Sequence, residues 1–186
     1  MAAPSPAKLY TVEDLDGLPD DGTRYELHEG ELTAMPPSQR NSTELGLEFG
    51  RLLANFVRGK KLGYVSGADG GYILARDPDL VFAPDAGFIT RDRAGGRDEG
   101  YFQAAPDLAV EVISPSDRAS AVRKKLEQYF EHGTRLIWVV YPDTRTIEEH
   151  TSGGSRRLSV EHTLDGGEVL PGFSASVADI FSILDE

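Results

Sequence analysis

Two apolar stretches decide the fold, Leu108-Ala-Val-Glu-Val-Ile113 and Arg135-Leu-Ile-Trp-Val-Val-Tyr141. Apart from Glu111, both are apolar on both faces of an extended chain, which is typical of strands buried inside an α/β sheet. Between them, Ser114-Pro-Ser-Asp117 ends the first strand, and we expect it to cap a helix that stops at Gly133. The order strand, helix, strand predicts a right-handed βαβ unit within a mixed sheet.

The flanking sequence adds further strands and helices to this unit. Residues 24–35 alternate polar and apolar side chains around a Glu-Gly pair, which predicts a hairpin. Apolar residues spaced by three and four between residues 42 and 57 predict an amphipathic helix, and short strands follow between residues 64 and 89. We therefore expect residues 10–186 to form one α/β domain, preceded by a loose Ala- and Pro-rich tail over residues 1–9.

Composition and charge exclude several classes of protein. The 186 residues carry 19 Lys and Arg against 31 Asp and Glu, and this net charge of −12 excludes a basic protein that coats nucleic acid. The chain has no cysteine, so disulfides, thiolate zinc sites and a cysteine nucleophile are excluded. No apolar run approaches the roughly 18–20 residues that cross a bilayer, and the first residues do not resemble a signal peptide. We therefore expect a cytoplasmic protein with no membrane partner.

Two carboxylates are candidates for a functional site. Glu111 shares a strand face with Ala109 and Ile113, and a lone carboxylate buried among apolar side chains needs a partner or a cation. The alternative is that Glu111 reaches water at the strand end or pairs with an arginine. Asp85 is the second candidate, because Pro84 marks the start of a short strand at the margin of the sheet. Its alternative is an ordinary turn, since Pro-Asp occurs five times in the chain.

The helix that follows Glu111 offers a lysine. At about 100° per residue, Lys124 points away from the apolar stripe of the helix, whereas Lys125 lies on its border. A lysine on that border can lay its stem on the sheet and bring its ammonium toward the strand ends. Without Asp85 and Glu111, a solvated helix face would be the preferred interpretation of both lysines.

Two carboxylates and a lysine at a sheet edge favour metal-dependent phosphodiester hydrolysis. Carboxylate oxygens bind Mg²⁺, which keeps several waters and bridges to phosphate oxygens. The ion lowers the pKa of a bound water, while the lysine orients or deprotonates that water or stabilises the developing charge. The residue types therefore indicate a phosphodiesterase chemistry, provided that the fold brings them together.

A set of motifs extends over most of the chain. They are Tyr25-Glu-Leu-x-x-Gly-Glu-Leu32, Met35-Pro-Pro37, Pro84-Asp85, Pro106-Asp-Leu-x-Val-Glu-Val-Ile-Ser-Pro-Ser-Asp117, Lys125-x-x-x-Tyr129, Gly133 and Trp138. Together they resemble the Uma-two family of restriction endonucleases, which belongs to the PD-(D/E)XK nuclease superfamily. The resemblance implies a restriction-endonuclease-like α/β core, with a mixed central β-sheet flanked by helices. It also implies a site for Mg²⁺ or Mn²⁺ and cleavage of DNA.

The resemblance also assigns roles to individual residues. Asp85 and Glu111 would be metal ligands, and Lys125 would replace the usual superfamily lysine, whose position is held here by Ile113. Ile113 could still offer its backbone carbonyl to the metal. Glu31 matches a family position and would add a carboxylate or hold a metal-bound water, with an exposed hairpin charge as the alternative.

Partners and rival functions follow from the charge. Basic residues within 51–61 and 118–125 could contact phosphates, but the net charge predicts weak or context-dependent affinity for DNA. A homodimer would pool these patches, and the strand around Trp138 could form part of its interface or be plain core. The four histidines lack metal-ligand spacing, and we interpret them as surface or strand-edge residues. Two rivals to a nuclease are a silent nuclease-fold binding or regulatory module and a metal-dependent phosphoesterase for a small substrate.

Overall fold

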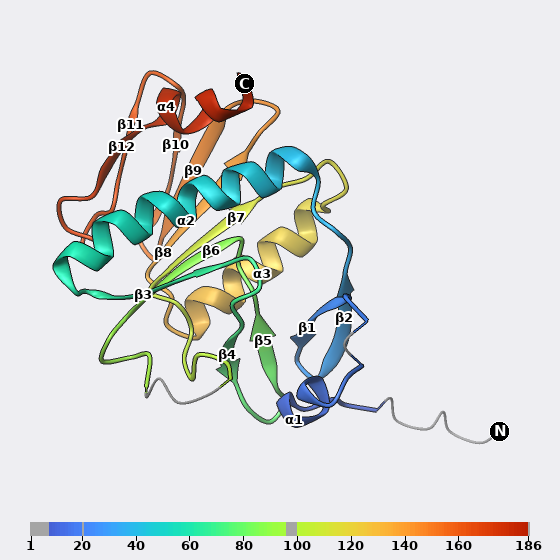
Figure 1. The fold of residues 1–186 in the computed structure, drawn as a ribbon. Coiled ribbons are helices and arrows are strands. Elements are labelled where there is room, and N and C mark those ends of the chain that lie inside the picture. Colours follow the sequence, from blue (N-terminus) through green and yellow to red (C-terminus); the bar gives the residue numbers. More distant parts are fainter. Residues whose placement is uncertain (1–7, 20, 96–99, 186) are drawn as a thin grey trace.

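The computed structural model describes residues 8–19, 21–95 and 100–185. The predicted tail over residues 1–9 falls mostly on residues 1–7, which lie outside the described residues. The central element is a six-stranded sheet in the order β10-β9-β8-β7-β6-β3 (Figure 1). Its strands are β3 (Gly63–Gly67), β6 (Ala86–Thr90), β7 (Leu108–Val112), β8 (Leu136–Tyr141), β9 (Thr146–Thr151) and β10 (Gly154–Leu158). Strands β7 and β8 are parallel and the other neighbours are antiparallel, so the predicted mixed sheet is confirmed.

The connection from β7 to β8 is the predicted helix, α3 (Ala119–Glu131). It is followed by Gly133, whose φ of 96° is the conformation expected after a helix end. The expectation that Ser114–Asp117 caps this helix is wrong. The cap residue is Arg118, which makes no side-chain capping hydrogen bond. Asp117 instead accepts a hydrogen bond from the backbone N–H of Ser114 at 2.7 Å, because the segment closes on itself as a turn.

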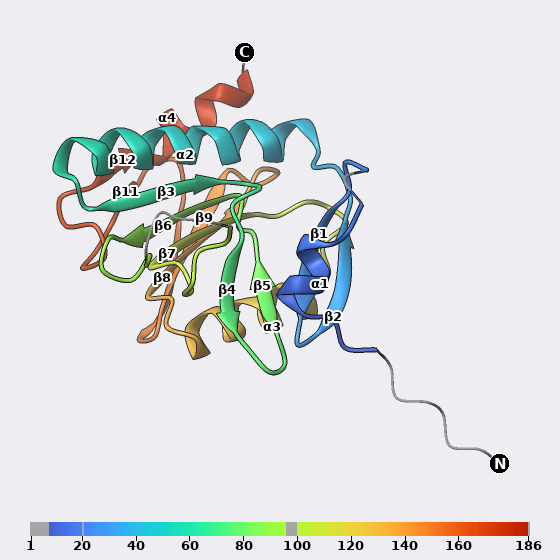
Figure 2. The same cartoon turned by 60° about the horizontal axis from the view of Figure 1, so that its bottom comes forward.

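Two helices cover opposite faces of the central sheet, as Figure 2 shows. Helix α2 (Arg40–Lys60) packs on the face that carries Leu108, Val110 and Val112, together with the C-terminal elements. Helix α3 packs on the other face, where Tyr129 contacts the cluster that contains Ala109. The C-terminal elements are β11 (Thr163–Asp165), β12 (Ser174–Ser176), α4 (Val177–Ser182) and the 3₁₀ helix η1 (Ile183–Asp185). The alternation of side chains along β7 therefore assigns Glu111 to the α3 face.

A second, smaller sheet lies beside the central one, in the order β2-β1-β5-β4 (Figures 1 and 2). Its elements are β1 (Arg24–His28), β2 (Glu31–Met35), β4 (Tyr72–Ala75) and β5 (Leu80–Phe82), and the short helix α1 (Val12–Asp16) precedes them. Phe82 of this sheet packs against Tyr129 of α3, with the ring centroids 5.2 Å apart. This contact joins the smaller sheet, which includes the N-terminal hairpin of β1 and β2, to the helix that carries Lys125.

The strand around Trp138 belongs to the core and not to a dimer face. Strand β8 lies between β7 and β9, and Trp138 is fully buried with Phe49 and Phe173 at ring-centroid distances of 5.8 and 5.4 Å. Among the described residues, no helix combines the length and the apolar character needed to cross a membrane.

Asp107 fixes the ends of three elements of the central sheet. Its side chain is fully buried and accepts hydrogen bonds from the Thr90 N–H at 2.7 Å, from Arg93 at 2.8 Å and from Arg135 at 3.1 Å. Burial opposes ionisation, but the Thr90 N–H and the Arg93 guanidinium hold the pKa of Asp107 below its usual value. Asp107 is therefore a structural carboxylate.

Replacing this carboxylate should destabilise the fold. We expect Asp107→Asn to lower the free energy of unfolding by about 2–4 kcal/mol at pH 7, because an amide cannot accept from all three donors. The loss should shrink as the pH falls below about 4, because the unfolded chain then takes up a proton at Asp107 that the folded protein binds more weakly. Urea denaturation at several pH values measures both effects. The exposed Pro-Asp residue Asp143 supplies the control, and an equal effect of Asp143→Asn would contradict the assignment.

Candidate active site

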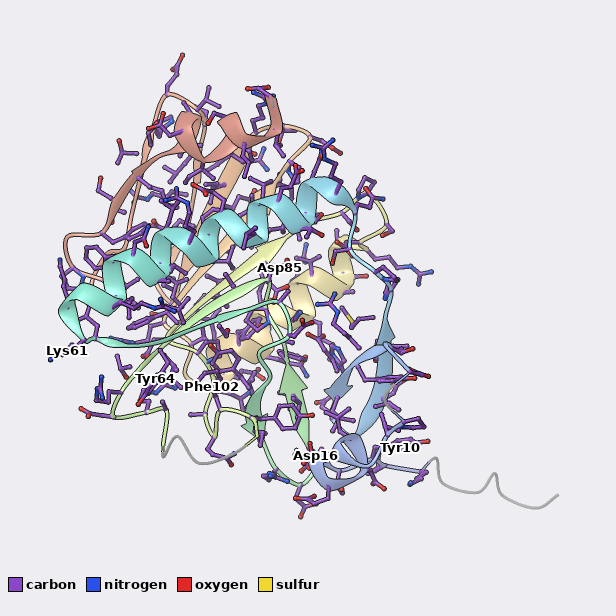
Figure 3. The ribbon with its side chains drawn as sticks, in the orientation of Figure 1. Tyr10, Asp16, Lys61, Tyr64, Asp85 and Phe102 are labelled. Atoms are coloured by element: carbon purple, nitrogen blue, oxygen red, sulfur yellow. The ribbon has the colours of Figure 1, made fainter. Side chains whose placement is uncertain are left out.

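A cleft of about 1160 Å³ lies between the N-terminal hairpin, the first turn of α2, and the loop from β7 to α3. All five residues that the sequence analysis selected line this cleft: Glu31, Asp85, Glu111, Ile113 and Lys125. Figure 3 labels Asp85 between α2 and α3. The fold thus brings the residues to one region, although they come from β2, the start of β6, β7 and its end, and α3.

Asp85 lies directly before β6 and beside Glu111. Strand β6 pairs Ala86 with Val110 of antiparallel β7, so one more residue along this register puts Asp85 across from Glu111. One oxygen of Asp85, Oδ2, accepts a hydrogen bond from the Val112 N–H at 2.7 Å. The described part of the chain donates no hydrogen bond to Oδ1. Burial raises the pKa of Asp85, which the Val112 N–H partly offsets.

Helix α2 approaches Asp85 closely because position 46 is glycine. A Cβ atom at Gly46 would lie 3.3 Å from the Cβ of Asp85 and 3.4 Å from its carbonyl oxygen. Glycine inside a helix costs about 1 kcal/mol relative to alanine, so the residue is suited to a position of close approach. The packing of α2 therefore limits how far Asp85 can move.

Glu111 faces α3 and is held by two of its side chains. The Tyr129 hydroxyl donates to Glu111 Oε1 at 2.8 Å, and Lys125 Nζ donates to Oε2 at 3.1 Å. Burial raises the pKa of Glu111 to about 7; the ammonium of Lys125 opposes the rise, and the charges of Asp85 and Glu26 add to it. The sequence analysis named Tyr129 in the motif Lys125-x-x-x-Tyr129 without giving it a role. Its spacing of four from Lys125 puts both polar atoms on one helix face.

The two lysines of α3 lie as the helical pattern predicts. The Lys125 side chain is 15% exposed and points into the cleft, whereas that of Lys124 is 58% exposed. Lys124 forms a surface ion pair with Glu29, with Nζ 2.8 Å from Oε2. Lys125 is therefore the lysine that can act in the cleft.

Glu26 is a fourth charged residue of the site, which the sequence analysis did not select. Its side chain is 2% exposed, and its Oε1 lies 3.0 Å from Lys125 Nζ. Its other partners are the Ala83 N–H at 2.9 Å and His28 Nε2 at 3.1 Å, so His28 is not simply a surface residue. Burial opposes ionisation, yet Lys125 and His28 lower the pKa of Glu26 to about 2.

A local signal could not reveal the burial of Glu26. In an isolated hairpin, Glu26 and His28 share the polar face of β1, which predicts exposure to solvent. The motif Tyr25-Glu-Leu named the position without giving it a role. In the structure, Lys125 of α3 and the backbone at Ala83 contact Glu26 and leave it little exposed.

Glu31 and Ile113 are less directly involved. Glu31 is exposed on β2 and lines the cleft, but it makes no hydrogen bond or ion pair with Asp85, Glu111 or Lys125. Ile113 lines the cleft just after β7, and its N–H donates to Val140. The structure therefore brings Asp85, Glu111 and Lys125 together, with Glu31 apart from them.

The donor set is compatible with a divalent cation. The free oxygen of Asp85, the carboxylate of Glu111 and the carbonyl of Ile113 are hard oxygen donors of the kind that Mg²⁺ prefers. Among the described residues, no three His, Cys, Asp or Glu side chains form a metal-binding cluster. Two carboxylates are nevertheless enough for Mg²⁺, which takes the rest of its shell from water and substrate phosphates.

Comparisons with known proteins agree with this architecture. The model of the Uma2 (Uma-two) family, described as "Putative restriction endonuclease", matches residues 12–178. The chain therefore belongs to this family. A crystal structure described as a putative nuclease belonging to DUF820, from Anabaena variabilis, superimposes with a TM-score of 0.80 at 20% identity. The match covers 94% of this chain and 98% of that one, and it shows the same mixed α/β fold. No curated protein matches.

The raised pKa of Glu111 should make stability depend on pH. The folded protein binds the Glu111 proton more tightly than the unfolded chain does, so this group lowers stability progressively as the pH rises from 4.5 to about 7. Glu111→Gln removes that loss. We therefore expect the difference in the free energy of unfolding, variant minus wild type, to grow by on the order of 2–3 kcal/mol as the pH rises from 5 to 8.

Urea denaturation in the presence of EDTA measures this difference. The exposed Glu31→Gln serves as the matched control and should follow the wild-type pH profile. Parallel profiles for Glu111→Gln and wild type would show that Glu111 does not titrate in this range.

Proposed function

We propose that this protein is a Mg²⁺- or Mn²⁺-dependent endonuclease that hydrolyses phosphodiester bonds of DNA. The observation that carries the proposal is the convergence of Asp85, Glu111 and Lys125 in one cleft, from the start of β6, from β7 and from α3. Family membership supports the reaction class. The unequal roles of Lys124 and Lys125, one on the surface and one in the cleft, support the choice of the lysine.

The metal site would be formed by Asp85, Glu111 and the backbone carbonyl of Ile113. A bound Mg²⁺ would lower the pKa of a water and neutralise charge on the phosphate. The Val112 N–H orients the Asp85 carboxylate, and the Tyr129 hydroxyl orients Glu111. These contacts hold both carboxylates before any ligand binds, which reduces the cost of reorganisation during the reaction.

Lys125 would act as a fixed ammonium and not as a base. Burial opposes its charge, but the carboxylates of Glu111 and Glu26 raise the pKa of Lys125 above its usual value. It therefore stays protonated at neutral pH and has no lone pair to accept a proton from water. Its role would be to orient the attacking water and to stabilise the negative charge that develops on the phosphate oxygens.

DNA would bind through a few local cations at the cleft. Arg24 and Arg118 line it and would contact phosphates. Because the whole chain carries a charge of −12, affinity should be weak and should fall steeply with salt. A homodimer would place two such sets of cations on one DNA molecule.

The acidic body also favours a second candidate, a metal-dependent phosphoesterase for a small substrate. A small phosphodiester needs fewer cationic contacts than DNA does. The same cleft residues would carry out the hydrolysis. A nuclease-fold protein without catalytic activity is the third candidate, and the experiment below must distinguish it from the other two.

The test is cleavage of supercoiled plasmid in Mg²⁺ or Mn²⁺. We expect nicking by the wild type, loss of nicking in EDTA, and a fall of about 100-fold or more for Asp85→Asn and for Lys125→Met. Lys124→Met should cleave as the wild type does, because Lys124 is exposed on the surface of α3, where it pairs with Glu29. Equal nicking by the wild type and Asp85→Asn would reveal a contaminating nuclease and overturn the proposal.

The rivals give different results in the same assay. Metal-dependent hydrolysis of bis(p-nitrophenyl) phosphate without plasmid cleavage would identify the small-substrate phosphoesterase. Activity on neither substrate, with retained binding of DNA, would identify a binding module.

A further inference from the structure

We infer that Glu26 of the N-terminal hairpin is a positioning residue that holds the Lys125 ammonium in place beside Glu111. The inference rests on the proposed function, since it concerns the orientation of the lysine in that reaction. It also gives the smaller sheet a role in the site, because β1 of that sheet supplies the carboxylate that positions Lys125.

The flexible side chain of Lys125 needs contacts that fix the position of its ammonium group. Lys125 belongs to a helix and not to β7, and its side chain has four rotatable bonds, whose ordering costs conformational entropy. In the structure, Nζ lies 3.0 Å from Glu26 Oε1 and 3.0 Å from Glu111 Oε1. The rings of Phe82 and Tyr129 lie near the same atom, at 5.3 and 6.0 Å from their centroids. The ammonium is therefore held between two carboxylates and two aromatic rings.

Glu26 is itself fixed by two contacts besides Lys125. Its Oε1 accepts from the Ala83 N–H at 2.9 Å, and its Oε2 lies 3.1 Å from His28 Nε2. With only 2% of its side chain exposed, Glu26 has little surface for contact with substrate, so it acts through Lys125. A buried carboxylate also needs a counter-charge, which ties Glu26 to the lysine.

A neighbouring ion pair provides a matched control. Glu29 and Lys124 also join the hairpin to α3, with 2.8 Å between Oε2 and Nζ, but their side chains are 55% and 58% exposed. Breaking this pair removes a contact between the same two elements without touching Lys125. Comparing the two variants therefore distinguishes an effect on the position of Lys125 from an effect on the packing of the hairpin against α3.

The first experiment measures plasmid cleavage kinetics. We expect Glu26→Gln to lower kcat by at least about tenfold with little change in KM, because substrate contacts remain. Glu29→Gln should match the wild type. In a Lys125→Met background, Glu26→Gln should cause no further loss. An equal loss in both backgrounds, or a change in KM alone, would overturn the inference.

The second experiment does not depend on activity. Acetic anhydride labelling followed by mass spectrometry gives the relative reactivity of Lys125 and Lys124 in the metal-free protein. Glu26→Gln should increase labelling of Lys125 several-fold and leave Lys124 unchanged, while Glu29→Gln should affect Lys124 only. Unchanged labelling of Lys125 in a folded Glu26→Gln protein would show that Glu26 does not hold it.

Two further results complete the test. If Glu26→Gln does not fold, His28→Gln is used instead, because it replaces one partner of Glu26. We expect this variant to raise the labelling of Lys125 by a smaller factor. No increase in labelling would count against the inference. A wild type that cleaves no DNA overturns the proposed function and the catalytic purpose of the contact. The labelling result still decides whether Glu26 holds Lys125, so the two failures can be told apart.

Discussion

The buried ammonium of Lys125 donates to two carboxylates, Glu26 and Glu111, which come from different sheets. Asp85 lies beside Glu111, so three negative charges surround one positive charge when all are ionised. Burial makes such an excess of charge costly, and it raises the pKa of Glu111 to about 7. Either a proton on Glu111 or a cation in the cleft relieves it. In the proposed function, a divalent ion bound in the cleft would balance this negative charge.

The fold produces this arrangement through three separate constraints. Antiparallel pairing of β6 and β7 puts Asp85 across from Glu111, and the parallel βαβ connection lays α3 over the Glu111 face. The smaller sheet then packs against α3 through Phe82 and closes the site with Glu26. Each constraint contributes one charged side chain, which explains how residues far apart in the chain meet in one cleft.

The Pro-Asp pairs show how similar local sequences acquire different roles. Asp79 accepts from the Val12 N–H and ties α1 to the smaller sheet, and Asp107 accepts from two arginines and a backbone N–H. Asp85 bonds one backbone N–H and keeps an oxygen toward the cleft. Nothing within the dipeptide separates these cases. The sequence analysis selected Asp85 from its place at the start of a strand, and the family resemblance added the role of a metal ligand.

The sequence by itself determined the βαβ unit, the hairpin, the long helix and the position of Lys125 on the border of the apolar stripe, because each is encoded in a local period of two or 3.6 residues. It also indicated Glu111, as a charge within an apolar strand. Only the tertiary structure decided that Glu26 is buried, that Asp117 closes a loop and does not cap α3, and that Glu31 stays outside the central contacts. Glu26 and Lys125 are 99 residues apart, and their contact depends on how a hairpin docks on a helix, which no local pattern records.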